Sequence, residues 1–206
     1  MEQELIVRDL TPQDDIRTVV RLIYETDEYI YPYMFSSRPE EAECVLGQMI
    51  AADTVYHWSH IKTAVVGGRI AGIVVWHKYP VKASRRAMLE AYARADAVAD
   101  ERFERVYNDY FGLLEGEPEG VYIANVCVDK AFRGRGIAKA LLGGFLRDGE
   151  TYHLEAVQQN AAAVRLYEAL GFRVTGEYEG FGGVPCYRMT RPPRDEKLSA
   201  DSGISQ

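Results

Sequence analysis

The sequence of 206 residues predicts an α/β fold with a mixed sheet covered by helices. Short apolar, β-rich runs alternate along the chain with segments whose apolar residues recur at helical spacing. The apolar fraction is 47%, which suffices for the core of one domain of ordinary size. A glycine-rich turn also joins a strand-like run directly to an amphipathic helix. We therefore expect one domain over residues 1–191, followed by a disordered tail at residues 192–206.

The first half of the chain is expected to contain three strands and two helices. Thr11-Pro12 is expected to cap and start the first helix, because proline suits a first helical turn. Gly67-Gly68 stands between two β-rich runs and indicates a tight hairpin. In order, the elements are a strand at 5–10, a helix from Thr11 to about Glu25, a helix between Pro39 and Ala52, and strands at 61–66 and 70–79.

The second half of the sequence predicts strands that alternate with two short helices. Asn160 is a good N-cap, and Gly171 suits the left-handed position that follows a helix. Ile137, Leu141 and Phe145 share one face of the preceding helix. In order, the elements are a strand at 121–128, the helix that follows Gly136, a strand near 152–157, the helix that Asn160 caps, and strands at 172–179 and 186–191.

The turn between the strand at 121–128 and its helix has the features of an anion site. Glycines let the backbone approach a ligand closely, and the free N–H groups of a first helical turn favour negative charge. The net charge of −7 argues against a basic surface that binds nucleic acid. A dinucleotide fingerprint fails because Lys139 replaces its third glycine. The anion-site residues are Arg133, Gly134, Arg135, Gly136, Ile137, Ala138 and Lys139.

Two sequence blocks together resemble the GNAT superfamily of N-acetyltransferases. The spacing Arg133-x-x-Gly136-x-Ala138 is similar to its pyrophosphate signature. The second block, Leu154-Glu155-Ala156 followed by Asn160 and the run through Phe172, is similar to L-E-V…N-x-x-A-x-x-L-Y-x-x-x-G-F, with alanine in place of valine. That form occurs in ribosomal-protein alanine acetyltransferases. The resemblance implies the GNAT fold, with a splayed central pair of strands, and acetyl-CoA as co-substrate.

The resemblance also implies roles for individual residues. Glu155 matches the usual general base, and Tyr167 is expected to return a proton to the sulfur of coenzyme A. The alternative for Glu155 is a charged residue on the open face of a strand. The alternative for Tyr167 is an aromatic residue that only packs on the apolar face of its helix. Backbone N–H groups of Val126, Cys127 and Val128 would polarise the acetyl carbonyl and, with the Asn160 side chain, hold the pantetheine arm.

One segment departs from the minimal family plan. About forty residues, 81–119, replace a short hairpin, and their apolar residues repeat at helical spacing. A lid over the acceptor pocket is one interpretation, and a helical pair packed on the body or on a second subunit of a homodimer is the other. The repeating residues are Met88, Tyr92, Ala95, Phe103, Val106, Tyr107, Tyr110 and Leu114.

The acceptor is expected to be the primary amine of a small molecule. Carboxylates and aromatic rings gather after the first helix and in the closing turn, which favours a cationic amine. Protein N-terminal or lysine acetylation is an alternative, and a non-catalytic acyl-CoA sensor is an alternative of another class. The residues concerned are Tyr24, Asp27, Glu28, Tyr29, Tyr31, Tyr33, Tyr178 and Phe181.

Composition sets the remaining expectations. No apolar run approaches a membrane span and the N-terminus is acidic, so we expect a cytoplasmic protein without a membrane partner. Three widely spaced cysteines suggest neither a disulfide framework nor a zinc site. His57 and His60 are the only close histidine pair, and we expect no metal.

Overall fold

The computed structural model describes residues 4–79, 84–111 and 119–193 and contains a seven-stranded mixed sheet. Its strand order is β1-β2-β3-β4-β5-β7-β6, and the β4–β5 pair is parallel while the other neighbours are antiparallel. The predicted mixed sheet is confirmed. The strands are β1 (Leu5–Asp9), β2 (Ile61–Val66), β3 (Arg69–Lys78), β4 (Val121–Val128), β5 (Tyr152–Val157), β6 (Arg173–Glu179) and β7 (Pro185–Arg191).

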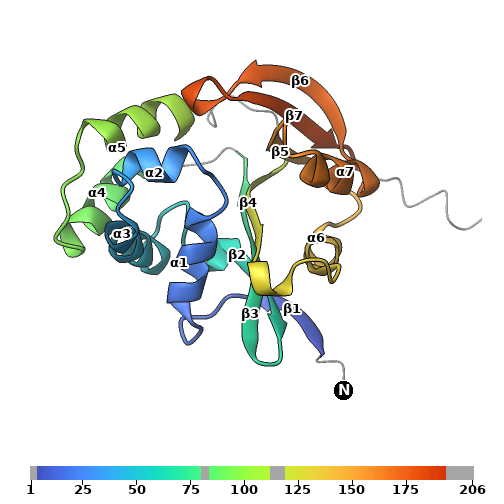
Figure 1. Cartoon of the computed structure of the whole chain (residues 1–206), viewed down its shortest axis with the longest axis horizontal. Coiled ribbons are helices and arrows are strands. Elements are labelled where there is room, and N and C mark those ends of the chain that lie inside the picture. The colour runs from blue at the N-terminus through green and yellow to red at the C-terminus, as the bar shows by residue number, and fades with distance from the viewer. Residues whose placement is uncertain (1–3, 80–83, 112–118, 194–206) are drawn as a thin grey trace, which may run out of the picture.

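Helices cover both faces of this sheet and divide the apolar core in two (Figure 1). On one face, five helices form what we call the α1–α5 core; on the other, two helices form the α6–α7 core. The helices are α1 (Ile16–Tyr24), α2 (Ile30–Met34), α3 (Pro39–Ala51), α4 (Arg85–Arg94), α5 (Glu101–Val106), α6 (Ile137–Phe145) and α7 (Ala161–Ala169). No helix among the described residues is long and apolar enough to cross a membrane.

The two central parallel strands separate after a short paired stretch. β4 and β5 are in register only at Val121 with Tyr152, Tyr122 with His153 and Ile123 with Leu154. Beyond these pairs, β4 stays bonded to β3 and β5 stays bonded to β7. The strands therefore open a wedge in the middle of the sheet.

A β-bulge interrupts β4 where the wedge begins. Trp76 of β3 pairs with Ile123 and Val75 pairs with Asn125, so Ala124 is an extra residue. Simple alternation would place Asn125 on the same face as Ile123, which belongs to the α6–α7 core. The bulge instead turns Asn125 toward α1 and α2.

The predicted start of the first helix was wrong, whereas the later caps behave as expected. Thr11 forms a turn with Asp14, and α1 begins at Ile16 with Asp15 as its cap. Asp14 is also bonded to Arg8 of β1, so the residues at 11–14 connect the strand to the helix. The short helix α2 had no sequence signal.

Residues 84–111 of the segment between β3 and β4 form α4, α5 and a short π-helical turn at Tyr107–Phe111. Two of their aromatic side chains pack inward: the Tyr92 ring lies 6.2 Å from the Phe35 ring and 5.1 Å from the Phe103 ring, between centroids. Phe103 is 1% exposed. This segment is therefore part of the α1–α5 core, and Leu114 lies outside the described residues.

Candidate active site

A cleft of about 580 Å³ passes through the wedge between β4 and β5. Its lining comes from both faces of the sheet: Tyr31 and Asn125 belong to the α1–α5 side, and Ala163 and Tyr167 of α7 belong to the other. Strand residues between them, including Glu155, complete the wall. Because the strands diverge here, a long ligand can enter from one face of the sheet and meet a second ligand from the other.

The glycine-rich turn forms a second hollow of about 200 Å³ at the start of α6. Gly134 has a φ of 76° and Gly136 a φ of 73°, a left-handed conformation that side chains disfavour. No side chain in the described part of the chain caps α6, so the first-turn N–H groups of this helix are open to a ligand. Lys139 lines the same hollow. This geometry suits a phosphate or diphosphate group.

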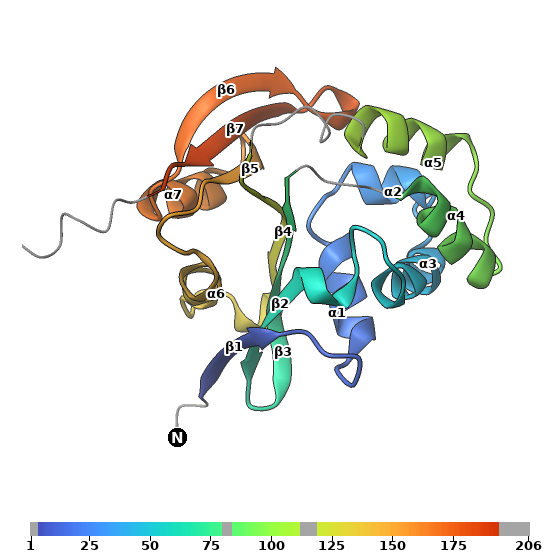
Figure 2. The ribbon, with the colours of Figure 1, turned by 180° about the vertical axis from the view of Figure 1, so that it is seen from behind.

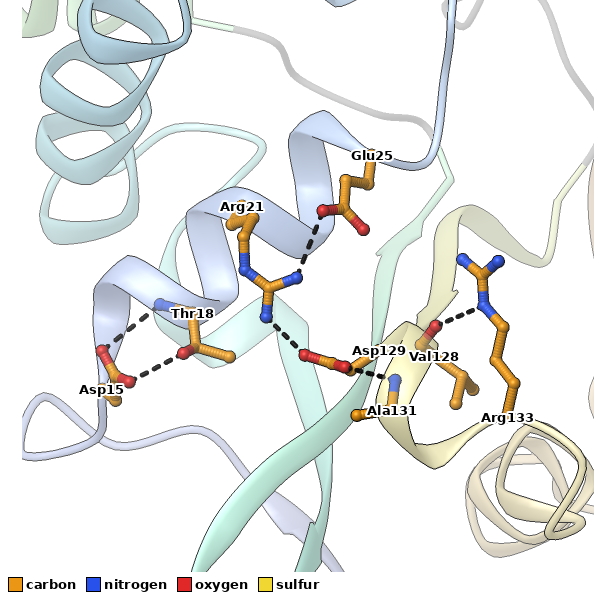
Figure 3. A network of polar contacts seen from close by, with 8 residues as sticks. All are labelled: Asp15, Thr18, Arg21, Glu25, Val128, Asp129, Ala131 and Arg133. Atoms are coloured by element: carbon orange, nitrogen blue, oxygen red, sulfur yellow. Dashed lines mark hydrogen bonds and ion pairs between the residues drawn. The ribbon is translucent and has the colours of Figure 1, made fainter.

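Polar contacts tie this turn to the first helix. Figure 3 shows Asp129, at the end of β4, accepting bonds from Arg21 of α1 at 2.5 Å and from the Ala131 N–H at 2.8 Å. Both contacts lower the pKa of Asp129, and the backbone bond from Ala131 has the larger effect. On the other side of the turn, the Arg133 Nε donates to the Val128 carbonyl oxygen at 3.0 Å. The turn is thus held before any ligand binds.

The structure divides the predicted cofactor residues between the two hollows. Arg135 lines neither: its guanidinium lies 5.5 Å from the centre of the Phe132 ring. The Cys127 side chain also lines neither, because it points into the α1–α5 core. The hollow at α6 is lined by Val128, Arg133, Gly134, Gly136, Ile137, Ala138 and Lys139, and the cleft by Val126, Glu155, Asn160 and Tyr167.

Glu155 lies on β5 one residue past the last pair with β4. Its side chain is 26% exposed, and Arg188, its cross-strand neighbour on β7, has Nε 3.9 Å from the Glu155 Oε1. The Arg188 guanidinium also lies over the Tyr178 ring at 5.2 Å. Glu155 is therefore a half-buried carboxylate at the wedge opening, accompanied by a cation that sequence reasoning missed.

Tyr167 reaches the cleft from α7. The residue is 8% exposed, and its ring packs edge-on against Phe172 with centroids 5.9 Å apart. Burial raises the pKa of Tyr167 to about 12. The phenol therefore carries its proton throughout the physiological pH range and is available as a donor. Asn160, at the start of the same helix, accepts a bond from the Ala163 N–H at 3.1 Å and confirms the predicted cap.

The two buried cysteines near the wedge are neutral thiols. Burial raises the pKa of Cys127 to about 11, and burial also raises the pKa of Cys186. A thiol is a much weaker nucleophile than a thiolate. Neither cysteine is therefore prepared to accept an acyl group.

A chain of neutral polar side chains forms the floor of the cleft on the α1–α5 side. The Asn125 Nδ2 donates to the Thr26 Oγ1 at 2.7 Å and to the Tyr31 hydroxyl at 3.1 Å. The Tyr31 and Tyr56 hydroxyls are themselves 3.1 Å apart. Of this group only Tyr31 was named from the sequence, and Asn125 was missed because this residue reaches the group only through the bulge at Ala124.

The outer end of the cleft is bounded by α5, α2 and the turn between β6 and β7. Both views place α5 beside that turn (Figures 1 and 2). The Arg105 guanidinium lies 5.6 Å from the centres of both the Tyr33 and Phe181 rings. Asp109 pairs with Arg105 and also lines the cleft. The helical segment thus contributes polar residues to the cleft, while its buried aromatic residues pack in the core.

Among the residues that the structure describes, no group of three or more histidine, cysteine, aspartate or glutamate side chains could hold a metal ion. His57, His60 and His77 do approach one another as rings, with centroid distances of 6.3 Å and 5.4 Å from His60 to the other two. Burial lowers the pKa of His77 to about 3, so this ring stays neutral.

Comparisons with known proteins agree with this geometry. The chain is 43% identical over 112 residues to a mycothiol acetyltransferase of Nocardiopsis dassonvillei, covering 52% of this chain and 31% of that protein. It is 37% identical over 79 residues to the N-alpha-acetyltransferase RimI of Mycobacterium tuberculosis, covering 35% of this chain and 49% of that protein. In both alignments the chain spans less than half of the relative.

The fold is shared with solved acetyltransferase structures. An N-acetyltransferase from Staphylococcus aureus Mu50 superposes with a TM-score of 0.66 at 19% identity, covering 90% of this chain and 99% of that one. The model of the acetyltransferase (GNAT) domain family matches residues 71–192, which include β4, the turn at α6, β5 and α7. This chain belongs to the GNAT acetyltransferase family.

Proposed function

We propose that this chain transfers an acetyl group from acetyl-CoA to the primary amine of a small molecule by direct attack. The observation that carries this proposal is the cleft that passes through the sheet, with an anion-binding turn at α6 on one face and Glu155 facing the other. Acetyl-CoA fits this layout, since its diphosphate suits the turn and its pantetheine arm is narrow enough for the wedge between β4 and β5.

In the proposed mechanism, Glu155 takes a proton from the ammonium group, because a primary amine is mostly protonated at pH 7. Beyond Ile123, no strand of the described residues pairs with the β5 side of β4, so N–H groups among Val126 to Val128 are available to stabilise the developing negative charge on the carbonyl oxygen. Glu155 passes the ammonium proton to solvent before the amine attacks. The amine nitrogen then bonds to the carbonyl carbon as the C–S bond breaks, Tyr167 gives its proton to the departing sulfur, and Glu155 takes the second proton from the nitrogen. Direct attack is favoured because the buried cysteines are neutral thiols.

Arg105 supports a small acceptor. Its guanidinium bridges Tyr33 of α2 and Phe181 of the β6–β7 turn, which narrows the outer end of the cleft. A protein N-terminus is the second candidate acceptor. The identity to the N-alpha-acetyltransferase RimI favours it.

The test measures CoA release with spermidine, kanamycin, lysine and the peptide tetraalanine as acceptors. The proposal predicts that a small amine is acetylated with a higher kcat/KM than tetraalanine. Turnover of the peptide alone would favour the second candidate. Binding of acetyl-CoA without turnover of any acceptor would favour a non-catalytic sensor and overturn the proposed function.

Glu155→Gln tests the general base. We expect kcat to fall by about 10²–10⁴-fold while the Kd for acetyl-CoA stays within about twofold, because base catalysis is lost and the turn at α6 is untouched. Glu168→Gln is the matched control, since it removes an equal charge from an exposed position on α7 and should retain kcat. An equal loss of turnover and of acetyl-CoA affinity in Glu155→Gln would contradict the assignment.

A further inference from the structure

Asn125 lies in the cleft opposite Glu155 and has no role in the proposed mechanism. It is 8% exposed, lies on β4 two residues past the last pair with β5, and lines the cleft. Glu155 lies one residue past the same pair on the parallel strand. Because the bulge adds one residue to β4, Asn125 and Glu155 reach comparable heights on opposite sides of the wedge.

The hydrogen bonds around Asn125 determine which way its amide faces. The Thr26 hydroxyl donates to the Ile23 carbonyl oxygen at 2.6 Å, so its own oxygen can only accept from Asn125. The atom 2.7 Å from the Thr26 Oγ1 must therefore be the amide nitrogen, and the second proton of that nitrogen is directed to the Tyr31 hydroxyl. No described residue donates a hydrogen bond to the Asn125 Oδ1, and because Asn125 lines the cleft, this oxygen is available to accept one from a ligand there.

From this arrangement we infer that the Asn125 Oδ1 accepts a hydrogen bond from the attacking nitrogen and makes the enzyme selective for primary over secondary amines. The inference rests on the proposed acetyl transfer. A neutral primary amine has two N–H bonds and one lone pair. If one N–H faces Glu155 and the other faces Asn125, the lone pair is aimed at the thioester carbon.

The chemistry of the step balances without a further reactant. The step starts from the neutral amine with Glu155 ionised, the ammonium proton having left through Glu155 to solvent. The C–N bond forms, the C–S bond breaks, Glu155 receives one proton of the neutral amine, and the sulfur receives the Tyr167 proton. Proton exchange with solvent then restores the Glu155 carboxylate and the Tyr167 phenol. After transfer the nitrogen keeps one N–H, which remains directed at the Asn125 Oδ1. A secondary amine has a single N–H for Glu155 and offers nothing to Asn125.

The experiment compares kcat/KM for paired acceptors in the full chain: Nα-acetyllysine against Nα-acetyl-Nε-methyllysine, and tetraalanine against its N-methyl derivative. In Asn125→Ala we expect kcat/KM for the primary amine to fall about tenfold or more, with little change for the secondary amine. The ratio between them should fall by the same factor. Asn125→Asp retains an acceptor oxygen at this position and should preserve more of the ratio than Asn125→Ala.

Two further variants separate positioning from general loss of structure. Thr63→Val removes a buried hydroxyl that donates to the Arg8 carbonyl oxygen, away from the cleft, and should leave the ratio unchanged. Thr26→Val is isosteric and removes the group that orients the Asn125 amide, so it tests the same claim if Asn125→Ala fails to fold. We expect Thr26→Val to lower the ratio in the same direction.

The outcomes separate a failure of the proposed acetyl transfer from a failure of the role inferred for Asn125. No CoA release by the wild-type chain with any acceptor in the panel would overturn the proposed function, and the inference with it. Turnover by the wild-type chain with an unchanged ratio in Asn125→Ala, or in Thr26→Val where the former does not fold, would overturn the inference alone. An equal loss for primary and secondary amines would do the same.

Discussion

The substitution Tyr167→Phe isolates one hydroxyl in the α6–α7 core. The ring is 8% exposed and packs against Phe172, and phenylalanine preserves that packing. Burial raises the pKa from 10.0 to about 12, which favours the protonated phenol by about 3 kcal/mol. At pH 9 only about one molecule in a thousand has lost the proton. If Tyr167 supplies the proton to the departing sulfur, we expect Tyr167→Phe to lower kcat about 10²-fold or more.

The assay follows CoA release at saturating acetyl-CoA from pH 6 to 10, beside the Kd for acetyl-CoA and the melting temperature. Wild-type turnover should show no alkaline decline caused by Tyr167 in this range. Tyr152→Phe is the matched control: its hydroxyl accepts a bond from the Arg147 N–H at 2.8 Å, so it should lose stability and retain kcat. Unchanged kcat in Tyr167→Phe would refute the acid role.

Stability gives an independent check on the same pKa. Between pH 10 and 12 the unfolded chain ionises this tyrosine while the folded chain keeps it neutral. The folded state therefore loses up to about 3 kcal/mol of stability across that window from this residue. Tyr167→Phe should lose less stability over the same pH range in urea unfolding. Identical pH profiles of wild type and variant would contradict the raised pKa.

Two further substitutions test the phosphate turn and the helical segment. Gly136→Ala places a side chain at a φ of 73° and should cost about 1–2 kcal/mol while raising the Kd for acetyl-CoA about tenfold in calorimetry. Gly149→Ala, at a φ of 86° in open space, should cost similar stability without affecting that Kd, and equal Kd values would contradict the prediction. Phe103→Ala should destabilise the chain by about 3–5 kcal/mol in urea unfolding, because the residue is 1% exposed. Val98→Ala, at 79% exposed, should change stability by less than about 0.5 kcal/mol, and a small effect at Phe103 would contradict its place in the core.

Local chemistry explains which predictions from sequence were successful. Gly67 and Gly68 both adopt positive φ in the predicted hairpin, and Asn160 caps α7 through its own side chain. These signals act within a few residues, so they can be predicted from the sequence. The predicted start of α1 was wrong because Thr11 and Asp15 are both good N-caps. Contacts of Asp14 with Arg8 in the neighbouring strand favour Asp15 as the cap.

The candidate site was only partly predictable, for a related reason. The resemblance of the second sequence block to the GNAT signature points to Glu155 and Tyr167, and both line the cleft. Arg188 reaches Glu155 through strand register, since the two residues are far apart in the sequence and opposite each other in the sheet. Arg105 similarly reaches the cleft only because α5 packs beside the β6–β7 turn.

By itself the sequence determined the order of the strands and most of the helices, the glycine-rich turn before α6 and the family resemblance, because propensity, capping and motif spacing are local properties. Only the tertiary structure decided that β4 and β5 part after Ile123 and that a bulge at Ala124 turns Asn125 toward α1 and α2. Strand register and the choice of buried face depend on partners distant in the chain, and those partners meet only when the sheet forms.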